Sequence, residues 1–313
     1  MRIVAIGGGT GLSVLLRGLK GAAVDVTAVV TVGDDGGSSG RLRSELGLLP
    51  PGDFRTCIAA LADDEALMTQ VLQYRFGDGS LGGHALGNLL LVAMASITGS
   101  FERAVLEMAR VLNIRGRIMP STLESVAVCA EVEPCCDGDG RARTVRGESK
   151  VGEAGRPIRR VFLEPGAPPA YPGAVSAILK ADLIVLGPGS LYTSVLPNLL
   201  VPGVREAVRA SGALKLYVCN VAVQVGETEG YSVEQHAQAI ESNAGAGLFQ
   251  YVVANNRYPE GGRVGYVRPR TEGGDGPAVV MGDLVDERQP WRHDSVKLGS
   301  LLLDFARGEP VAA

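Results

Sequence analysis

The sequence predicts an α/β protein with a doubly wound, mainly parallel sheet and a small antiparallel β insertion. Short apolar runs recur along the chain, and they are continuous rather than alternating, as in strands that are buried on both faces of a parallel sheet. Segments with helical apolar spacing lie between these runs. Glycine-rich turns follow the runs at Ile3–Ile6 and Leu183–Leu186, where open α/β sheets place their ligands.

The individual strands and helices are placed by the apolar spacing. We expect strands at Ile3–Ile6, Val26–Val32, Leu183–Leu186, Leu216–Val218 and Tyr251–Ala254. We expect helices at Leu12–Leu19, Arg41–Leu46, Thr56–Leu61, Ala66–Arg75, Leu86–Ile97, Glu102–Leu112, Val175–Lys180, Val233–Glu241 and His293–Arg307. Ser232 and Gln235 have the spacing of a capping box. The Gly- and Pro-rich segment Pro259–Pro277 predicts loops.

The segment between about Arg115 and Leu163 has a different pattern. Turn residues separate the short strand-like runs Val126–Glu131, Arg143–Gly147 and Arg159–Leu163, which favours an antiparallel arrangement. We therefore expect a β-rich insertion at about 115–165 within a single α/β domain that covers residues 1–313.

Composition excludes several classes of protein. Apolar residues make up 46% of the 313 residues, and the net charge is −4 without a basic run, so no nucleic-acid partner is expected. The longest apolar stretch, Leu89–Ala95, is too short to span a bilayer. Met1 leads directly into a strand, which leaves no room for a secretory signal. We expect a cytoplasmic protein without membrane insertion.

The cysteines form no disulfide framework and no zinc pattern. Their number is odd, no CxxC is present, and the three histidines are far apart in the sequence. This usage is typical of a reducing compartment, and it leaves the role of the adjacent Cys135 and Cys136 open. The remaining cysteines are Cys57, Cys129 and Cys219.

The first glycine turn is Gly7-Gly-Gly-Thr-Gly11. Backbone N–H groups and the helix dipole attract phosphates to such a turn, and Thr10 can cap the helix or donate its hydroxyl to an anion. The dinucleotide fingerprint fails because Leu12 or Val14 stands at its third glycine, and no P-loop Gly-Lys-Ser/Thr follows. We expect phosphate or nucleotide binding without ordinary NAD chemistry, and the alternative is a tight turn without a ligand.

A polar cluster follows the second strand. Asp34 and Asp35 can bind a divalent cation, a ribose or a sugar hydroxyl, which makes them the candidate metal ligands. Ser38, Ser39 and Arg41 can contact phosphate. The carboxyl ends of parallel strands meet at one edge, so this cluster should lie beside the first glycine turn. The alternative is a solvated loop in which a serine caps the next helix.

Two further segments carry candidate residues. Asp53 is a candidate N-cap, and Arg55 would then place a cation in the first turn, against the helix dipole, unless an anion or a carboxylate lies nearby. His84 and Asn88 are four residues apart and share one face of a predicted helix, which indicates a site at its N-terminus. The alternatives are a cap for Asp53 and a core role for His84.

The third strand ends in a second glycine turn, Gly187-Pro-Gly-Ser190, which is a further anion-binding turn or nest. Tyr192 follows in the same segment, and Asn220 stands at another strand end. Two such turns in one sheet indicate a ligand that spans the crevice with its phosphates at one end. We find no nucleophile–base–orienter set and no Ser-His-Asp order.

Together these motifs resemble the gluconeogenesis-factor (YvcK-like) family, within the superfamily of 2-phospho-L-lactate transferase (CofD-like). The resemblance covers most of the chain and is weakest beyond about Asn255. Ala85 and Thr56 depart from the serine and asparagine that are common in the family. The matching segments are Gly7–Leu12, Asp34–Arg43, Pro50–Asp53, Leu86–Leu90, Gly187–Ser194 and Tyr217–Asn220.

The resemblance implies a Rossmann-like sheet and a regulatory protein that binds a UDP-sugar such as UDP-N-acetylglucosamine or UDP-glucose. It also implies a role in cell shape and cell-wall synthesis during gluconeogenic growth, with a cell-wall or regulatory protein partner. Dimerisation through the β insertion or an exposed helix is a further expectation. The candidate ligand-binding residues are Gly8, Gly9, Thr10, Gly11, Asp34, Asp35, Ser38, Ser39, Arg41, Arg55, His84, Asn88, Gly187, Pro188, Gly189, Ser190, Tyr192 and Asn220.

The alternative is a magnesium-dependent transferase of the 2-phospho-L-lactate type, acting on a nucleoside diphospho-donor. Asp34 or Asp35 would hold the metal ion, and His84 or Asp53 would accept the hydroxyl proton. The acidic-basic run that follows Leu-Gly in the transferase branch is missing here, which argues against this alternative. A dinucleotide-dependent oxidoreductase is a third and weaker hypothesis.

Overall fold

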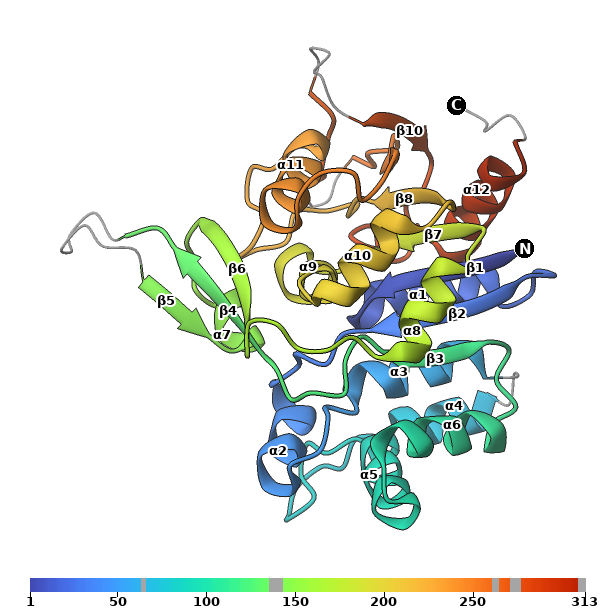
Figure 1. The fold of residues 1–313 in the computed structure, drawn as a ribbon, viewed down its shortest axis with the longest axis vertical. Coiled ribbons are helices and arrows are strands. Elements are labelled where there is room, and N and C mark those ends of the chain that lie inside the picture. Colours follow the sequence, from blue (N-terminus) through green and yellow to red (C-terminus); the bar gives the residue numbers. More distant parts are fainter. Residues whose placement is uncertain (63–65, 135–142, 261–264, 271–276, 309–313) are drawn as a thin grey trace.

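The computed structural model describes residues 1–62, 66–134, 143–260, 265–270 and 277–308. Its main layer is a parallel sheet of seven strands in the order β10-β9-β8-β7-β1-β2-β3 (Figure 1). The predicted fold class is confirmed. The strands are β1 (Arg2–Gly7), β2 (Asp25–Val30), β3 (Arg117–Pro120), β7 (Leu183–Leu186), β8 (Leu214–Val218), β9 (Tyr251–Asn255) and β10 (Ala278–Gly282).

The order of the strands creates a crevice beside β1. The chain runs outward from β1 to β2 and β3, and then returns to β7 on the other side of β1. Connections that leave neighbouring strands in opposite directions open a crevice beyond the carboxyl ends of those strands. Ile6 pairs with Leu186, so the two glycine turns begin side by side at this point.

Helices flank the sheet. On one side α1 (Gly9–Leu19) packs against α3 (Gly52–Leu61) and α12 (Ser295–Arg307), and elsewhere α8 (Pro172–Leu179) packs against α10 (Pro202–Ala210). The connection from β2 to β3 contains α2 (Gly37–Leu46), α4 (Ala66–Gln73), α5 (Leu86–Thr98) and α6 (Phe101–Val111). After β7 come a π-helical turn, η1 (Leu191–Val195), and α9 (Leu196–Leu199), and α11 (Val233–Ala244) precedes β9. The capping box of Ser232 and Gln235 is confirmed at the start of α11.

The β insertion is confirmed as an antiparallel sheet in the order β5-β4-β6. Its strands are β4 (Ala127–Val132), β5 (Arg143–Arg146) and β6 (Ile158–Glu164), and a short helix, α7 (Glu148–Gly152), lies between β5 and β6. The β insertion begins later than the predicted residue 115. The short strand β3 pairs in parallel with β2, so residues 117–120 belong to the main sheet.

Strand β10 and helices α9 and α10 were not predicted from the apolar pattern. Two residues of β10, Ala278 and Val279, are exposed at the sheet edge, so this strand lacks the fully buried pattern of β7. Cys57, Cys129 and Cys219 are free and buried, whereas Cys135 and Cys136 lie outside the described residues.

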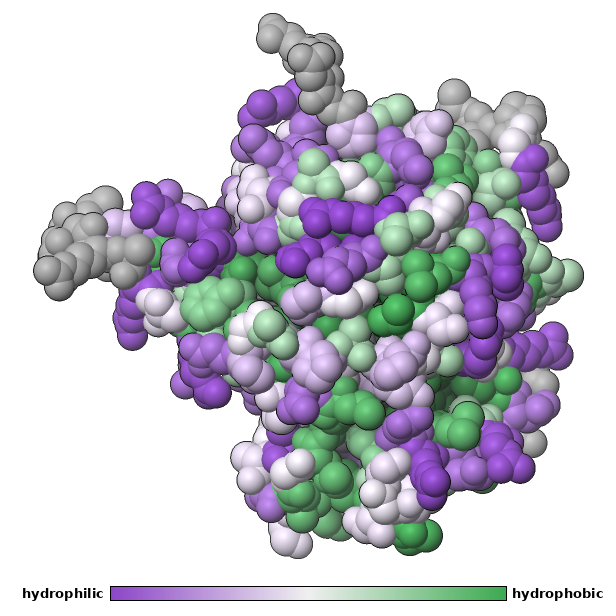
Figure 2. Space-filling model, viewed as in Figure 1, coloured by the Kyte–Doolittle hydropathy of each residue, from purple (hydrophilic) through white to green (hydrophobic). Residues whose placement is uncertain are grey.

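Apolar side chains also reach the surface. In Figure 2 they gather in the lower part of the molecule, around α5, where Leu90 and Ile97 are exposed. Within the described residues no single helix is long and apolar enough to cross a membrane. Taken together, α5 and α6 have the length and the apolar composition of a membrane span, but the two helices meet at a bend of 117°.

Candidate functional site

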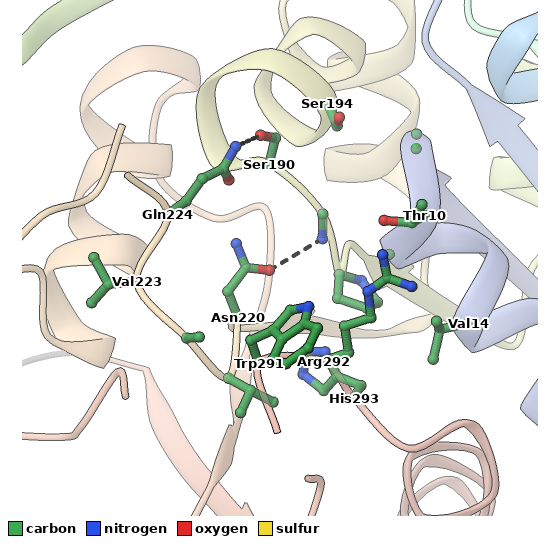
Figure 3. A pocket seen from close by; sticks show the side chains of 17 residues that line it. Thr10, Val14, Ser190, Ser194, Asn220, Val223, Gln224, Trp291, Arg292 and His293 are labelled. Carbon is green, nitrogen blue, oxygen red and sulfur yellow. Dashed lines mark hydrogen bonds between the residues drawn. The ribbon is translucent and has the colours of Figure 1, made fainter. Parts of the chain in front are cut away.

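The crevice beside β1 contains a cavity of about 410 Å³, which we call the glycine-turn cavity (Figure 3). Both glycine turns and the end of β8 form its floor, and the segment before α12 forms its far wall. Its lining residues are Gly8, Gly9, Thr10, Gly11, Val14, Pro188, Gly189, Ser190, Ser194, Asn220, Val221, Ala222, Val223, Gln224, Trp291, Arg292 and His293.

Packing explains part of the glycine content of the first turn. A Cβ atom on Gly11 would lie 2.5 Å from the carbonyl oxygen of Pro188, because the two turns touch. Gly9 has a φ of +63°, a conformation that favours glycine. The helix α1 begins at Gly9 with Gly8 as its N-cap, so Thr10 lies within the first turn and does not cap it. Thr10 and Gly11, in this first turn of α1, line the cavity.

Glu227 holds the second glycine turn in place. This buried carboxylate accepts hydrogen bonds from Ser190 Oγ at 2.8 Å, from Thr193 Oγ1 at 3.1 Å and from the backbone N–H of Tyr192 at 3.2 Å. Gln224 Nε2 donates a further bond to it at 2.8 Å. Burial raises the pKa of Glu227, and the hydrogen bonds oppose that shift. Glu227 was not among the predicted site residues, because it stands in a loop without apolar periodicity.

The far wall of the cavity was also missed. In Figure 3, Arg292 extends toward Thr10, and Trp291, the only tryptophan of the chain, lies at the same wall. His293 Nε2 lies 3.1 Å from the carbonyl oxygen of Cys219, and burial lowers the pKa of His293 to about 4. A neutral imidazole must therefore donate from Nε2 to that carbonyl, which anchors Trp291 and Arg292 against the end of β8.

A second cavity, of about 300 Å³, adjoins the first and shares Gly9 and Thr10 with it. We call it the carboxylate cavity. It receives the polar cluster that follows β2, as the sequence predicts. Its other lining residues are Asp34, Gly36, Gly37, Ser38, Ser39, Gly52, Asp53, Arg55, Thr56, Arg75 and Asn88.

A chain of buried hydrogen bonds forms one wall of the carboxylate cavity. Arg55 Nε donates to Asn88 Oδ1 at 2.9 Å, and Asn88 Nδ2 donates to Ser38 Oγ at 3.0 Å. His84 Nδ1 lies 3.1 Å from the same Ser38 oxygen. The shared helix face predicted for His84 and Asn88 is wrong, because α5 begins at Leu86 and its N-cap is Ala85. Both side chains instead meet at Ser38, which belongs to α2.

Asp53 faces the N-terminus of α1. Its carboxylate accepts a hydrogen bond from the backbone N–H of Gly9. The predicted N-cap role is wrong, since α3 begins at Gly52 with Pro51 as its N-cap, and Asp53 lies inside the first turn. Burial, and then the nearby Asp34, raise the pKa of Asp53 to about 7. Burial and the neighbouring carboxylates likewise raise the pKa of Glu148, in α7, to about 8.

The stability of the protein should therefore fall as the Asp53 carboxyl ionises. Its pKa is 3.8 in the unfolded chain and about 7 in the folded one, so the cost grows between about pH 4 and pH 7 and is complete above that range. We expect Asp53→Asn to raise the free energy of unfolding by about 1–2 kcal/mol at pH 8, since partial exposure to the cavity screens the full effect. At pH 4 the variant and the wild type should be nearly equal.

Urea denaturation at a series of pH values measures this difference. Asp78→Asn, at an exposed position, is the control. If the curves for Asp53→Asn and wild type stay parallel from pH 4 to pH 8, the carboxyl carries no such cost.

The two adjacent aspartates do not share a cavity. Asp34 Oδ1 accepts the backbone N–H of Gly36 at 2.9 Å, whereas Asp35 Oδ1 accepts both the N–H and the hydroxyl of Ser149, at 3.0 Å and 2.9 Å. Among the residues that the structure describes, no three His, Cys, Asp or Glu side chains are placed together to hold a metal ion. Asp34 and Asp35 thus do not fit a shared metal site, and magnesium stays a prediction.

Five sequence candidates lie outside the two cavities. His84 contacts Ser38, which lines the carboxylate cavity. Gly187 packs behind the second turn, where its Cβ would meet Val218 at 3.1 Å. The Tyr192 hydroxyl bonds to Tyr231 at 2.9 Å, on the side toward α11. Arg41, like Asp35, lines a third cavity between α2 and the antiparallel sheet.

Comparison with known proteins places the chain among close relatives. A family model described as 2-phospho-L-lactate transferase CofD matches residues 3–289. A protein from Bacillus subtilis named gluconeogenesis factor is 46% identical over 318 residues, which cover 98% of each chain. A protein of the same name from Halalkalibacterium halodurans is 52% identical over 254 residues, covering 81% of this chain and 77% of that protein.

Two further similarities concern length and fold. A relative from Nostoc sp. is 52% identical over 261 residues, and the match spans 82% of this chain but only 56% of that protein. The chain therefore spans about half the length of that relative. A crystal structure of a UPF0052 family protein from Bacillus halodurans has a TM-score of 0.89 and 44% sequence identity, covering 96% of this chain and 99% of that one.

Proposed function

This chain belongs to the 2-phospho-L-lactate transferase CofD family, and on that premise we propose that it is a regulatory protein that binds a nucleotide sugar. The ligand is a UDP-sugar of the UDP-N-acetylglucosamine or UDP-glucose type. Its binding controls cell shape and cell-wall synthesis during growth on gluconeogenic carbon, through a cell-wall or regulatory protein partner. The name gluconeogenesis factor, carried by relatives that match nearly the whole chain, supports this role.

The observation that carries the proposal is the pairing of the α1 N-terminus with Arg292 across the glycine-turn cavity. Helix N-termini attract phosphates through their N–H groups and dipole, and a guanidinium group adds a charge-assisted hydrogen bond. A diphosphate between Thr10 and Arg292 would interact with the helix N-terminus on one side and accept a hydrogen bond from the guanidinium group on the other. Trp291 offers an aromatic face for a base, and the amides of Asn220 and Gln224 offer donors and acceptors for its edge.

The carboxylate cavity supports the sugar half of the proposal. It continues from the glycine-turn cavity past Gly9 and Thr10, so a ligand with its phosphates at this turn reaches both cavities. Sugar hydroxyls both donate and accept hydrogen bonds. The carboxylate of Asp34 can accept from them, and the amide N–H₂ of Asn88 can donate to them. A base, a diphosphate and a sugar would then lie in that order along the crevice.

One observation favours the transferase alternative. A general base works best when its pKa lies near neutral pH, and Asp53 has a pKa of about 7 beside the glycine turn. In this alternative Asp53 would accept the proton of an attacking hydroxyl. Asp34 and Asp35 face different cavities and would not hold one metal ion together in this reaction.

Calorimetry and thermal-shift measurements test the proposal with UDP-N-acetylglucosamine, UDP-glucose, UDP, GDP and NAD, each with and without magnesium. We expect saturable binding of the UDP-sugars, a raised melting temperature, and intact sugar afterwards. Arg292→Gln should weaken this binding by about 10- to 100-fold, which corresponds to the loss of one charge-assisted hydrogen bond.

Arg288→Gln, an exposed arginine of the same segment, is the matched control and should bind like wild type. A preference for GDP, or recovery of a cleaved product, would move the function to the transferase alternative. Binding that is equal in both arginine variants would contradict the phosphate position.

A further inference from the structure

A third and larger cavity, of about 940 Å³, lies between α2, the loop before α5 and the antiparallel sheet. We call it the arginine cavity, because four guanidinium groups line it. Figure 1 shows α2 and the antiparallel sheet on the same side of the molecule. The lining residues are Asp35, Gly37, Ser38, Gly40, Arg41, Arg43, Ser44, Arg75, Gly83, Ser125, Ala127 and Arg146.

Backbone carbonyls, rather than carboxylates, hold most of these arginines. Arg41 donates to the carbonyl oxygen of Gly82 at 2.7 Å, and Arg75 donates to that of Gly83 at 3.1 Å. Arg43 bonds to the hydroxyl of Ser125 at 3.0 Å. Within the described ranges, neither Arg41, Arg43 nor Arg75 forms an ion pair with a carboxylate.

Two carboxylates lie near the cavity: Asp35 is part of its lining, and Glu164 pairs with one of the four arginines. Arg146 pairs with Glu164 at 2.8 Å, and Asp35 Oδ1 accepts the two bonds from Ser149. Burial lowers the pKa of Arg43, and the neighbouring Arg146 lowers it further, although Asp35 and Asp34 oppose the shift. Like charges held at one cavity cost free energy, and an anion between them would offset that cost.

We propose that the arginine cavity binds a small polyanion with phosphate or carboxylate groups, at a site separate from the glycine-turn cavity. Guanidinium groups bind both kinds of anion through paired N–H donors. The cavity lies between three elements and is open to solvent, so a small molecule can enter it directly. This site goes beyond the nucleotide-sugar proposal and does not depend on it.

The arginine cavity adjoins the carboxylate cavity. The arginine cavity shares Gly37, Ser38 and Arg75 with the carboxylate cavity, on the side away from the glycine turn. The polyanion would therefore lie next to the sugar end of a nucleotide sugar, as a second ligand of the same crevice.

Calorimetry on the full chain at low ionic strength tests the site with two probes, inorganic pyrophosphate and citrate. Arg41→Gln should weaken binding of at least one probe by about tenfold or more, since it removes one charge-assisted donor. It should leave the affinity for UDP-N-acetylglucosamine unchanged. Among the described residues, the one hydrogen bond of the Arg41 guanidinium goes to a backbone carbonyl, so the melting temperature should shift by no more than about 2 °C.

Two further variants separate the sites. Arg103→Gln removes an exposed arginine on α6 and controls for net charge. Arg292→Gln alters the glycine-turn cavity and should leave the probe binding that depends on Arg41 intact. If Arg41→Gln weakens the binding of pyrophosphate alone, the natural ligand carries phosphate groups. If it weakens the binding of citrate alone, the natural ligand is a carboxylic acid. If Arg41→Gln behaves like Arg103→Gln with both probes, or if only Arg292→Gln weakens them, the proposal is wrong.

Discussion

Glu227→Ala is expected to abolish ligand binding in the glycine-turn cavity and to lower the free energy of unfolding by about 3–5 kcal/mol. The side chain is 4% exposed and accepts bonds from Ser190, Thr193, Tyr192 and Gln224. Removing it takes the acceptor from three buried or half-buried donors, since Gln224 also bonds to Ser190 Oγ, and the second glycine turn loses the group that shapes it.

Two comparisons make this result specific. Glu227→Gln keeps one oxygen acceptor but points an amide N–H₂ at the remaining donors, so we expect a smaller loss, of about 1–3 kcal/mol. Glu206→Ala, at an exposed position on α10, should change stability by less than about 0.5 kcal/mol. Urea denaturation and calorimetry with UDP-N-acetylglucosamine measure both properties. A loss below about 1 kcal/mol in Glu227→Ala would show that the turn holds its shape without the carboxylate.

Gly11→Ala is expected to lower the free energy of unfolding by about 2–4 kcal/mol and to weaken ligand binding at least tenfold, because overpacked contacts force backbone shifts. The new Cβ would lie 2.5 Å from the oxygen and 2.7 Å from the carbon of the Pro188 carbonyl, and 2.8 Å from Gly189 Cα. All three are backbone atoms, so no side-chain rotation relieves the contact. The two glycine turns would have to move apart.

Gly21→Ala is the matched control, because nothing lies within 4 Å of the position of its Cβ. Its free energy of unfolding should match wild type within about 0.5 kcal/mol. Equal stability and equal binding in the two alanine variants would mean that the turns separate without cost, contrary to the packing seen here.

The local sequence was sufficient to predict the parts of the fold that depend on near neighbours. Strands β1 and β7 are buried on both faces, so their residues form continuous apolar runs that can be recognised without a structure. The glycine turns could also be recognised from the sequence, because the steric demand for glycine acts on single positions. Edge strands carry a weaker pattern, and β3 and β10 were therefore misassigned or missed.

Only the tertiary structure decided which polar residues meet at the cavities. Glu227 contacts Ser190, which is 37 residues away, and no local pattern predicts a hydrogen bond over that separation. Trp291 and Arg292 reach the first glycine turn only because the chain returns from β10 before α12. Asp34 and Asp35, adjacent in sequence, face different cavities because Ser149 binds one of them. Local patterns determined the strands and the turns, whereas contacts between distant segments decided the shape and charge of the cavities.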